Sequence, residues 1–299
     1  MLPNFVVIGA AKSGSTFLSR CLGEHPDVFL YPQEVAIFES PDWEEQGISS
    51  LQELLGYRTE CRVGITRPSY VGKPEVPARI VQHLPKAHLI AILRNPIDRA
   101  ISSYYHNMSY GFLPILDHEL GMRHVLNKAY SKRYRRAEEI LENGRYYKYL
   151  REYKYYLERG QLLVLLHDDL IQNPVETIQQ AYRFLGLDDS YVPEALDTRP
   201  QAVIYNMSRM RLLSLRNNIA YSYNQDRTRL EPIPMDELGG HRYRLLQFLE
   251  ALDNKVLAKV LQNRKPNLSQ DLRNRLLDVY QSDIQELQYL LNRDLSHWQ

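Results

Sequence analysis

The residues best suited to chemistry lie in a loop of small residues near the start of the chain. Gly9-x-x-x-x-Gly14-Ser15-Thr16 nearly matches the nucleotide-binding loop GxxxxGK[ST], whose backbone N–H groups surround a phosphate at a helix start. Ser15 stands where that motif has lysine, and Lys12 stands three residues earlier. The backbone cradle survives this change, so the loop predicts an anion site with Lys12 reaching the ligand from the other side.

The displaced lysine separates several classes of protein. In ATP hydrolysis the motif lysine bridges the outer phosphates beside a magnesium ion, so its absence at position 15 argues against that chemistry. A kinase or NTPase, with Asp168 after the apolar run 162–166 as a metal ligand, is one alternative. A catalytically silent nucleotide-binding or scaffold protein is another, and a glycine-bearing turn without a ligand is the third.

Strands and helices alternate around this loop. Short continuous apolar runs predict buried parallel strands, and segments with helical spacing follow them. The strands are expected at 5–8, 88–93 and 162–166, and the helices at 16–25, from about 97, at 174–186 behind Asn173 as N-cap, and after Ser269. The fold class is therefore α/β, a single domain over 1–299 whose central parallel sheet is flanked by helices. Ligands bind at the carboxyl ends of such strands, where Lys12 and Arg94 fall.

Two segments have no assigned chemistry. Residues 200–245 show no clear period and are rich in Arg, Asn and Tyr, which predicts a loop or lid. Among the 22 tyrosines, many lie in 144–157, where Tyr146, Leu150, Tyr153 and Leu157 form a helical stripe. Such a stripe predicts core packing, with sugar stacking by one or two rings as the alternative.

Composition limits the partners. Lys and Arg number 37 and Asp and Glu 36, a formal charge of +1, so no bulk attraction to nucleic acid or membrane is expected. Cys21 and Cys61 form no pairing motif, which fits a reducing compartment. The first strand begins by about Phe5, leaving no room for a signal peptide, and no later apolar run has membrane-spanning length. A cytoplasmic location without an integral membrane segment is expected.

Two motifs resemble those of the sulfotransferases that use 3′-phosphoadenosine 5′-phosphosulfate (PAPS). Lys12-Ser13-Gly14-Ser15-Thr16 is similar to their phosphosulfate loop, Lys-x-Gly-[Thr/Ser]-[Thr/Ser]. Arg94–Ser102 is similar to their Arg-[Asp/Asn]-Pro stretch, which leads to a serine eight residues after the arginine. The resemblance implies the sulfotransferase fold, which is P-loop NTPase-like, and a PAPS site built from these segments with no metal required.

The resemblance extends to the glycan sulfotransferases of the heparan-sulfate type. Gln33–Phe38 resembles their Lys-Glu-x-x-x-Phe segment, which implies Glu34 as the catalytic base. Pro68-Ser69-Tyr70 and 76–80 resemble their next block, and 294–298 resembles their carboxyl-terminal pattern. Arg264-Lys265-Pro266 belongs to that pattern too and adds Arg264 to the implied nucleotide-binding residues.

This chain departs from the glycan type at two positions. Thr66, with Arg67 beside it, stands where many relatives carry lysine, and Gln33 replaces the lysine before the implied base. Both changes bear on the acceptor more than on the chemistry.

The resemblance also implies roles for the residues. Lys12 offsets charge on the leaving phosphate, Arg94 and Ser102 bind the 3′-phosphate, and Glu34 accepts the proton of the attacking hydroxyl. A surface ion pair between Arg94 and Asp98 is the alternative for Arg94, and His106 or His25 is the alternative base. The expected acceptor is a sugar or glycolipid hydroxyl; a natural-product alcohol or a tyrosine phenol stays open. The product nucleotide would be 3′-phosphoadenosine 5′-phosphate (PAP).

Overall fold

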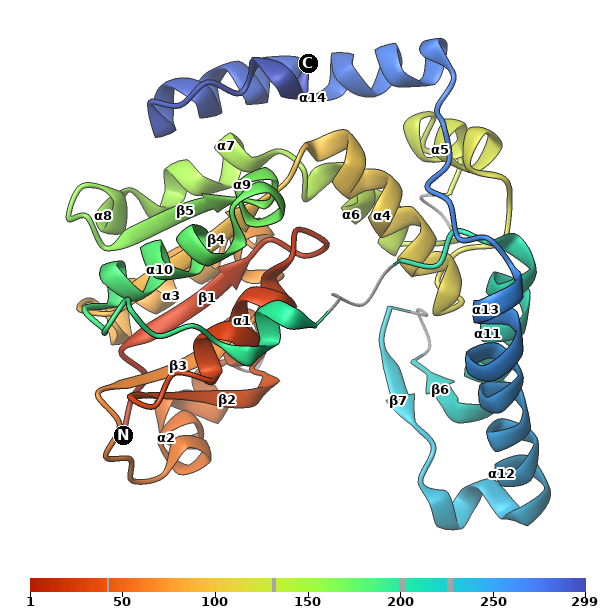
Figure 1. The fold of residues 1–299 in the computed structure, drawn as a ribbon, viewed down its shortest axis with the longest axis horizontal. Helices are drawn as coiled ribbons and strands as arrows, with labels where there is room; N and C mark the ends of the chain where they lie inside the picture. Colours follow the sequence, from red (N-terminus) through yellow and green to blue (C-terminus); the bar gives the residue numbers. More distant parts are fainter. Residues whose placement is uncertain (42, 131–132, 199–202, 225–227) are drawn as a thin grey trace. The chain divides into compact units, whose positions relative to one another are not determined.

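The computed structural model describes residues 1–299 except 42, 131–132, 199–202 and 225–227. The chain forms two compact units (Figure 1). The sheet unit comprises Met1–Pro96, Arg145–Gln201 and Gln281–Gln299, and the helical unit comprises Ile97–Gly144 and Ala202–Tyr280. That 1–299 acts as one sulfotransferase domain stays a prediction.

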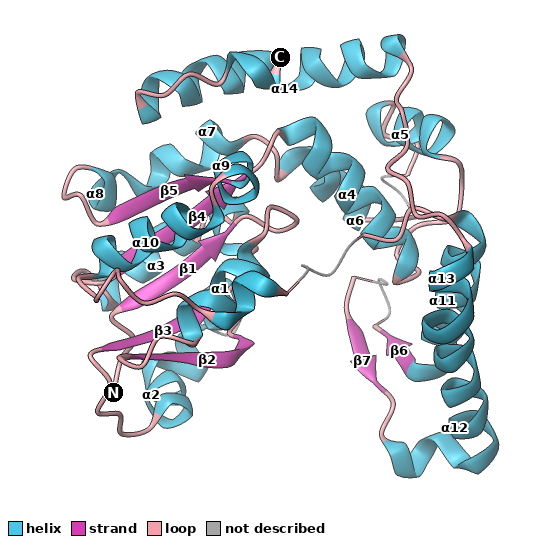
Figure 2. Ribbon diagram, viewed as in Figure 1, coloured by secondary structure: helices cyan, strands magenta, loops and turns pink. Residues whose placement is uncertain are grey.

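A five-stranded parallel sheet forms the centre of the sheet unit (Figure 2). Its strand order is β2-β3-β1-β4-β5, and every neighbouring pair runs parallel. The strands are β1 (Phe5–Gly9), β2 (Val28–Glu34), β3 (Arg62–Thr66), β4 (His88–Leu93) and β5 (Leu162–Leu166). The predicted α/β class is thus confirmed, and so are the three predicted strands.

Strand β3 was not expected from the sequence. Only Val63 and Ile65 give it apolar character, so it lacks the continuous run that marks its neighbours. Its Gly64 lies against the Phe5 ring, and a Cβ there would stand 2.2 Å from Phe5 Cζ. The pairing between strands therefore selects glycine at this position.

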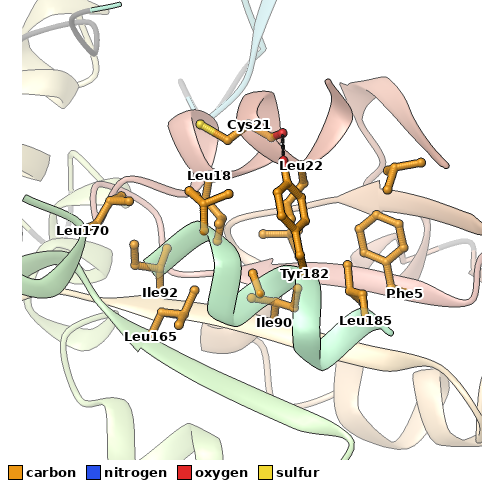
Figure 3. Packing of buried hydrophobic residues seen from close by; sticks show 14 of the residues in the cluster. Phe5, Leu18, Cys21, Leu22, Ile90, Ile92, Leu165, Leu170, Tyr182 and Leu185 are labelled. Carbon is orange, nitrogen blue, oxygen red and sulfur yellow. Dashed lines mark hydrogen bonds between the residues drawn. The ribbon is translucent and has the colours of Figure 1, made fainter. Parts of the chain in front are cut away.

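Helices cover the sheet, and two of them build its largest core cluster. Leu18 and Leu22 of α1 (Ser15–Gly23) and Tyr182 of α10 (Pro174–Leu185) pack with Phe5 of β1 and Ile90 of β4 (Figure 3). The other helical segments of this unit are α2 (Trp43–Leu55), α3 (Val76–His83), α7 (Tyr146–Leu150), α8 (Lys154–Leu157) and α9 (His167–Gln172).

The predicted tyrosine stripe packs in the core of the sheet unit. Tyr146 and Tyr153 are at most 1% exposed, as the prediction requires, whereas Leu157 is only half-buried and Tyr156 is buried instead. A 3-10 turn between α7 and α8 shifts the buried face by one residue. The Tyr153 and Tyr156 hydroxyls donate to backbone carbonyls at 3.0 and 2.8 Å, which satisfies these groups inside the core.

The helical unit corrects the expectation for 200–245. The segment is not a loop, because α11 (Met207–Ala220) lies within it and α12 (Met235–Leu252) begins in it and continues beyond residue 245. The buried face of α11 includes Arg209 and Asn217, so no apolar period marks it. Arg209 donates to both Asp253 oxygens, at 2.8 and 2.9 Å, which pairs the buried charge. A lid role stays a prediction, and 200–202 and 225–227 lie outside the described residues.

The remaining elements of the helical unit are α4 (Pro96–Ser109), α5 (His118–Leu126), α6 (Arg136–Glu142), the hairpin of β6 (Tyr221–Tyr223) and β7 (Leu230–Pro232), and α13 (Ala258–Val260). The unit boundary falls inside α14 (Gln270–Leu291), whose predicted cap is confirmed because Ser269 Oγ accepts from Leu272 N at 3.2 Å. At α10, Asn173 precedes the helix as predicted but makes no side-chain cap hydrogen bond.

None of the described helices is both long and apolar enough to cross a membrane.

Candidate active site

Four strands of the sheet unit end at one edge, and each either ends at a candidate residue or is followed by one. The glycine loop follows β1, Glu34 ends β2, Arg67 follows β3 and Arg94 follows β4. Parallel strands have their carboxyl ends at the same edge, which is where ligands of such sheets bind. Lys12, Glu34 and Arg94 therefore share an edge, as the sequence predicts for Lys12 and Arg94.

Backbone contacts on both sides hold the loop after β1. Ala10 N donates to Ile92 O at 2.8 Å, and Ala11 N donates to Pro68 O at 3.0 Å. Gly9 has a φ of 148°, and a Cβ there would lie 2.7 Å from Pro68 O. Lys12 adopts a left-handed φ of 68°, an uncommon conformation for a side-chain-bearing residue, which its neighbours must hold in place.

The start of α1 has the features of an anion site. The first N–H groups of a helix lack intrahelical acceptors, and the capping residue Gly14 makes no side-chain hydrogen bond to them. No acidic residue lies in the first turn, so the positive helix end is not offset there. Ser13 Oγ is buried and, within the described part of the chain, has no hydrogen-bond partner. These donors fit the oxygens of an anionic group.

Arg94 is fixed next to this loop. Its Nη1 donates to Lys12 O at 3.3 Å, and its own carbonyl accepts from the Tyr146 hydroxyl at 2.9 Å. The next residue, Asn95, donates from its side chain to Trp298 O at 3.3 Å. The guanidinium therefore lies against the backbone of the anion loop, and its predicted role at the 3′-phosphate stays a prediction.

Two predicted binding residues belong to the helical unit. Ser102 lies on α4 and is 1% exposed, and its Oγ has no hydrogen-bond partner among the residues that the structure describes. Arg264 is exposed on the connection before α14. Asp98, the alternative partner of Arg94, lies 2.7 Å from Lys265. The nucleotide roles of Ser102 and Arg264 stay predictions.

Glu34 is the last residue of β2, and its side chain is 52% exposed. Its Oε2 accepts from Arg67 Nη1 at 2.8 Å. The neighbouring Thr66 is buried, and its Oγ1 lies 2.9 Å from Ser19 Oγ of α1. Thr66 and the adjacent Arg67 therefore have different partners: Thr66 contacts α1, and Arg67 contacts the predicted base.

A second carboxylate, which the sequence analysis did not identify, completes this group. Arg67 also donates to Glu39 from Nε, at 2.8 Å, and from Nη2. Glu39 Oε2 accepts from Ser69 Oγ at 2.7 Å. Burial opposes the charge of Arg67, but its hydrogen bonds to Glu39 and Glu34 outweigh that effect and raise the pKa of the guanidinium. The available signal was the arginine beside the Pro68-Ser69-Tyr70 block.

The alternative residues have other contacts. His25 is 2% exposed, its Nδ1 accepts from Asp27 N at 3.1 Å, and its Nε2 lies 3.1 Å from Asp188 O, which is a structural arrangement. His106 is half-buried on α4 beside the Tyr110 ring. Asp168 Oδ2 accepts from Trp298 Nε1 at 2.8 Å, so this carboxylate anchors the carboxyl-terminal residues. The described residues contain no group of three His, Cys, Asp or Glu side chains placed to hold a metal ion.

Comparisons with known proteins identify relatives over much of the sequence. The family model for the sulfotransferase domain matches residues 2–220. The bifunctional heparan sulfate N-deacetylase/N-sulfotransferase 2 of Homo sapiens is 28% identical over 207 residues, which cover 62% of this chain and 22% of that protein. The heparan sulfate glucosamine 3-O-sulfotransferase 3A1 of Mus musculus is 26% identical over 194 residues, covering 62% and 46%. The chain thus spans less than half the length of these two relatives.

A solved structure shares the fold over the whole chain. The sulfotransferase from Alicyclobacillus acidocaldarius superposes with a TM-score of 0.68 at 21% identity, covering 100% of this chain and 99% of that one. The sheet order and the loop after β1 therefore belong to a known fold, and the resemblance to glycan-type sulfotransferases is confirmed by the relatives above. Since the family model covers well over half of the sequence, the chain belongs to the sulfotransferase family.

Proposed function

We propose that the chain transfers the sulfuryl group of PAPS to a hydroxyl group of an acceptor. The observation that carries the proposal is the uncapped helix start behind Gly14, with Lys12 in its loop, at the sheet edge that also carries Glu34 and Arg94. Membership of the sulfotransferase family supports the same reaction.

The nucleotide residues follow from the loop and the motifs. Lys12 and the N–H groups of Gly14 to Thr16 bind the 5′-phosphosulfate. Ser13 N already donates to Ala10 O at 3.2 Å, and the buried Ser13 hydroxyl supplies a further donor. Arg94, Ser102 and Arg264 bind the rest of the nucleotide, with Arg94 and Ser102 at the 3′-phosphate. That assignment rests on their match to the family's motifs.

The chemistry is a displacement in which three atoms must lie in line. The acceptor oxygen attacks sulfur, the bond from sulfur to the bridging oxygen breaks, and PAP leaves. Lys12 offsets the negative charge that builds on the departing phosphate, and Glu34 takes the acceptor proton. Positioning and electrostatic stabilisation carry most of the rate enhancement, by analogy with phosphoryl transfer.

The acceptor that we propose is a hydroxyl of a carbohydrate or glycolipid. Support comes from relatives that are named for heparan sulfate. In this chain the sequence has Gln33 and Thr66 where many glycan-type relatives have lysines, so the acceptor need not be the same glycan.

Calorimetry with PAP, PAPS and Mg-ATP tests the proposal. We expect PAP to bind far more tightly than ATP, and EDTA to leave both PAP binding and PAPS turnover unchanged. Magnesium-dependent preference for ATP would support a kinase or NTPase instead. Binding of PAP without any turnover of PAPS, with water and a panel of glycosides as acceptors, would indicate a catalytically silent protein.

A further inference from the structure

The predicted base has a specific partner in this chain. Glu34 Oε2 accepts from Arg67 Nη1 at 2.8 Å, and within the part of the chain that the structure describes this is the one hydrogen bond of the Glu34 side chain. The Glu34 side chain is 52% exposed, so packing alone does not restrict its rotamers. A glutamate of this kind loses side-chain entropy when it is ordered for reaction.

Arg67 is itself held more firmly than the carboxylate it contacts. The Arg67 side chain is 26% exposed, and its guanidinium donates to Glu39. The Glu39 side chain is 12% exposed and accepts from Ser69 Oγ. The Arg67 backbone is also fixed, because Arg67 N donates to Val7 O at 2.9 Å and Arg67 O accepts from Tyr70 N at 3.1 Å. A planar guanidinium anchored in this way can orient a carboxylate through a single further N–H.

The charges of the group alternate in sign. Arg67 contacts both Glu34 and Glu39, so Glu39 offsets part of the field of Arg67 at Glu34. The hydrogen bond to Oε2 of Glu34 is directional, and it leaves Oε1 for a proton from the acceptor.

We propose that Arg67, anchored by Glu39 and Ser69, is a positioning residue that aims the Glu34 carboxylate at the acceptor hydroxyl. The inference rests on the proposed function and adds to it a residue at a position next to the family's lysine. In this chain the cation stands one residue after Thr66, at Arg67, and it contacts the predicted base Glu34.

The test compares Arg67→Gln with Arg79→Gln in the full chain. Arg79 is a matched control on α3, because its Nη1 donates to the Phe38 and Ser40 carbonyls, at 2.8 and 3.1 Å, near the same block. PAP formation from PAPS is measured with water and with a glycoside panel as acceptors, beside PAP affinity and thermal stability. We expect Arg67→Gln to lower kcat by about 10²-fold, as misplaced catalytic groups do, with PAP affinity unchanged. Arg79→Gln should lower only stability.

A double-mutant cycle separates positioning from a structural role. In a Glu34→Gln background, Arg67→Gln should lower kcat little further, because the carboxylate that it orients is gone. Additive losses in the double variant would overturn the inference, as would equal kcat losses for Arg67→Gln and Arg79→Gln.

A second variant covers the case in which Arg67→Gln fails to fold. Arg67→Lys keeps the charge but lacks the planar guanidinium that donates to both Glu39 and Glu34, so kcat should fall about 10-fold. An unchanged kcat in Arg67→Lys would contradict orientation by the guanidinium. If the unmodified chain neither binds PAP nor turns over PAPS, the proposed function is wrong. If the unmodified chain turns over PAPS and the Arg67 variants do so at a normal rate, only the positioning role of Arg67 is wrong.

Discussion

The two halves of the sheet edge are built in different ways. The loop half, which follows β1 and β4, is held by backbone groups: Ala10 N donates to Ile92 O, and Tyr146 donates to Arg94 O. The carboxylate half, which follows β2 and β3, is held by charged side chains, with Arg67 between Glu34 and Glu39. One half therefore depends on the path of the chain, and the other depends on which side chains are present.

This difference determines which half of the sheet edge a single substitution can alter. Most side-chain replacements leave a backbone cradle in place, because its donors are common to all residues except proline. The carboxylate half depends on particular side chains, because the Arg67 guanidinium joins Glu34 and Glu39. A single substitution at Arg67 therefore removes both contacts.

The largest expected effect is a loss of turnover, and PAP affinity then distinguishes the two halves of the sheet edge. Glu34→Gln keeps shape but removes the base, so turnover should fall by roughly 10²–10⁴-fold while PAP affinity holds. Lys12→Ala should lower turnover and also weaken PAP, because Lys12 lies in the anion loop. Steady-state kinetics and calorimetry on both variants measure the contrast. Near-normal turnover of Glu34→Gln would place the base elsewhere, with His106 the next residue to test.

Arg94 tests which end of the nucleotide the loop half binds. Arg94→Ala should weaken PAP by roughly 1.5–3 kcal/mol, the range for a hydrogen bond to a charged group, and scarcely change affinity for 5′-AMP. Calorimetry with both nucleotides is the measurement. Equal losses would indicate that Arg94 acts by holding the loop, through its contact with Lys12 O at 3.3 Å, and not through the 3′-phosphate.

Gly9 tests whether the backbone path itself is required. A Cβ at Gly9 would lie 2.7 Å from Pro68 O and from Val71 Cγ1, so Gly9→Ala should cost roughly 1–3 kcal/mol of stability by overpacking. Gly160→Ala is the control, since Gly160 also has a positive φ, of 64°, but meets nothing within 4 Å. Denaturant unfolding compares the two, and PAP affinity should fall only for Gly9→Ala. Equal unfolding midpoints would argue against a constrained loop.

The smallest expected effect concerns the tyrosine support of the sheet unit. Tyr153→Phe leaves the Tyr70 carbonyl without its 3.0 Å donor and should cost about 1 kcal/mol. Burial also raises the pKa of Tyr153 well above its ordinary value. The unfolded chain then ionises this phenol from about pH 10 while the folded chain keeps the proton, so stability falls as pH rises toward the folded pKa.

Alkaline unfolding of the two forms checks this sign. Because one ionisation linked to unfolding is removed, the free energy of unfolding of Tyr153→Phe should fall less steeply above about pH 10 than that of the unmodified chain. Phenolate absorbance followed beside circular dichroism measures both transitions. Identical slopes would mean that Tyr153 titrates in the folded chain.

Much of the fold could be predicted because its signals are local. The strands β1, β4 and β5 are continuous apolar runs, since both faces of a parallel sheet are buried, and each precedes a loop or cap with recognisable chemistry. The glycine loop and Arg94 follow two of these strands, so their common edge follows from strand direction alone.

Other features depend on partners far along the chain. In β3, Gly64 leaves space for the Phe5 ring, and on the buried face of α11 Arg209 pairs with Asp253. By itself, then, the sequence determined the α/β class, the anion loop and the sulfotransferase resemblance, which all rest on short contiguous patterns. Only the tertiary structure decided that Arg67 contacts Glu34 and Glu39, which lie 33 and 28 residues away, because ion pairing depends on distances in space and leaves no periodic trace in the sequence.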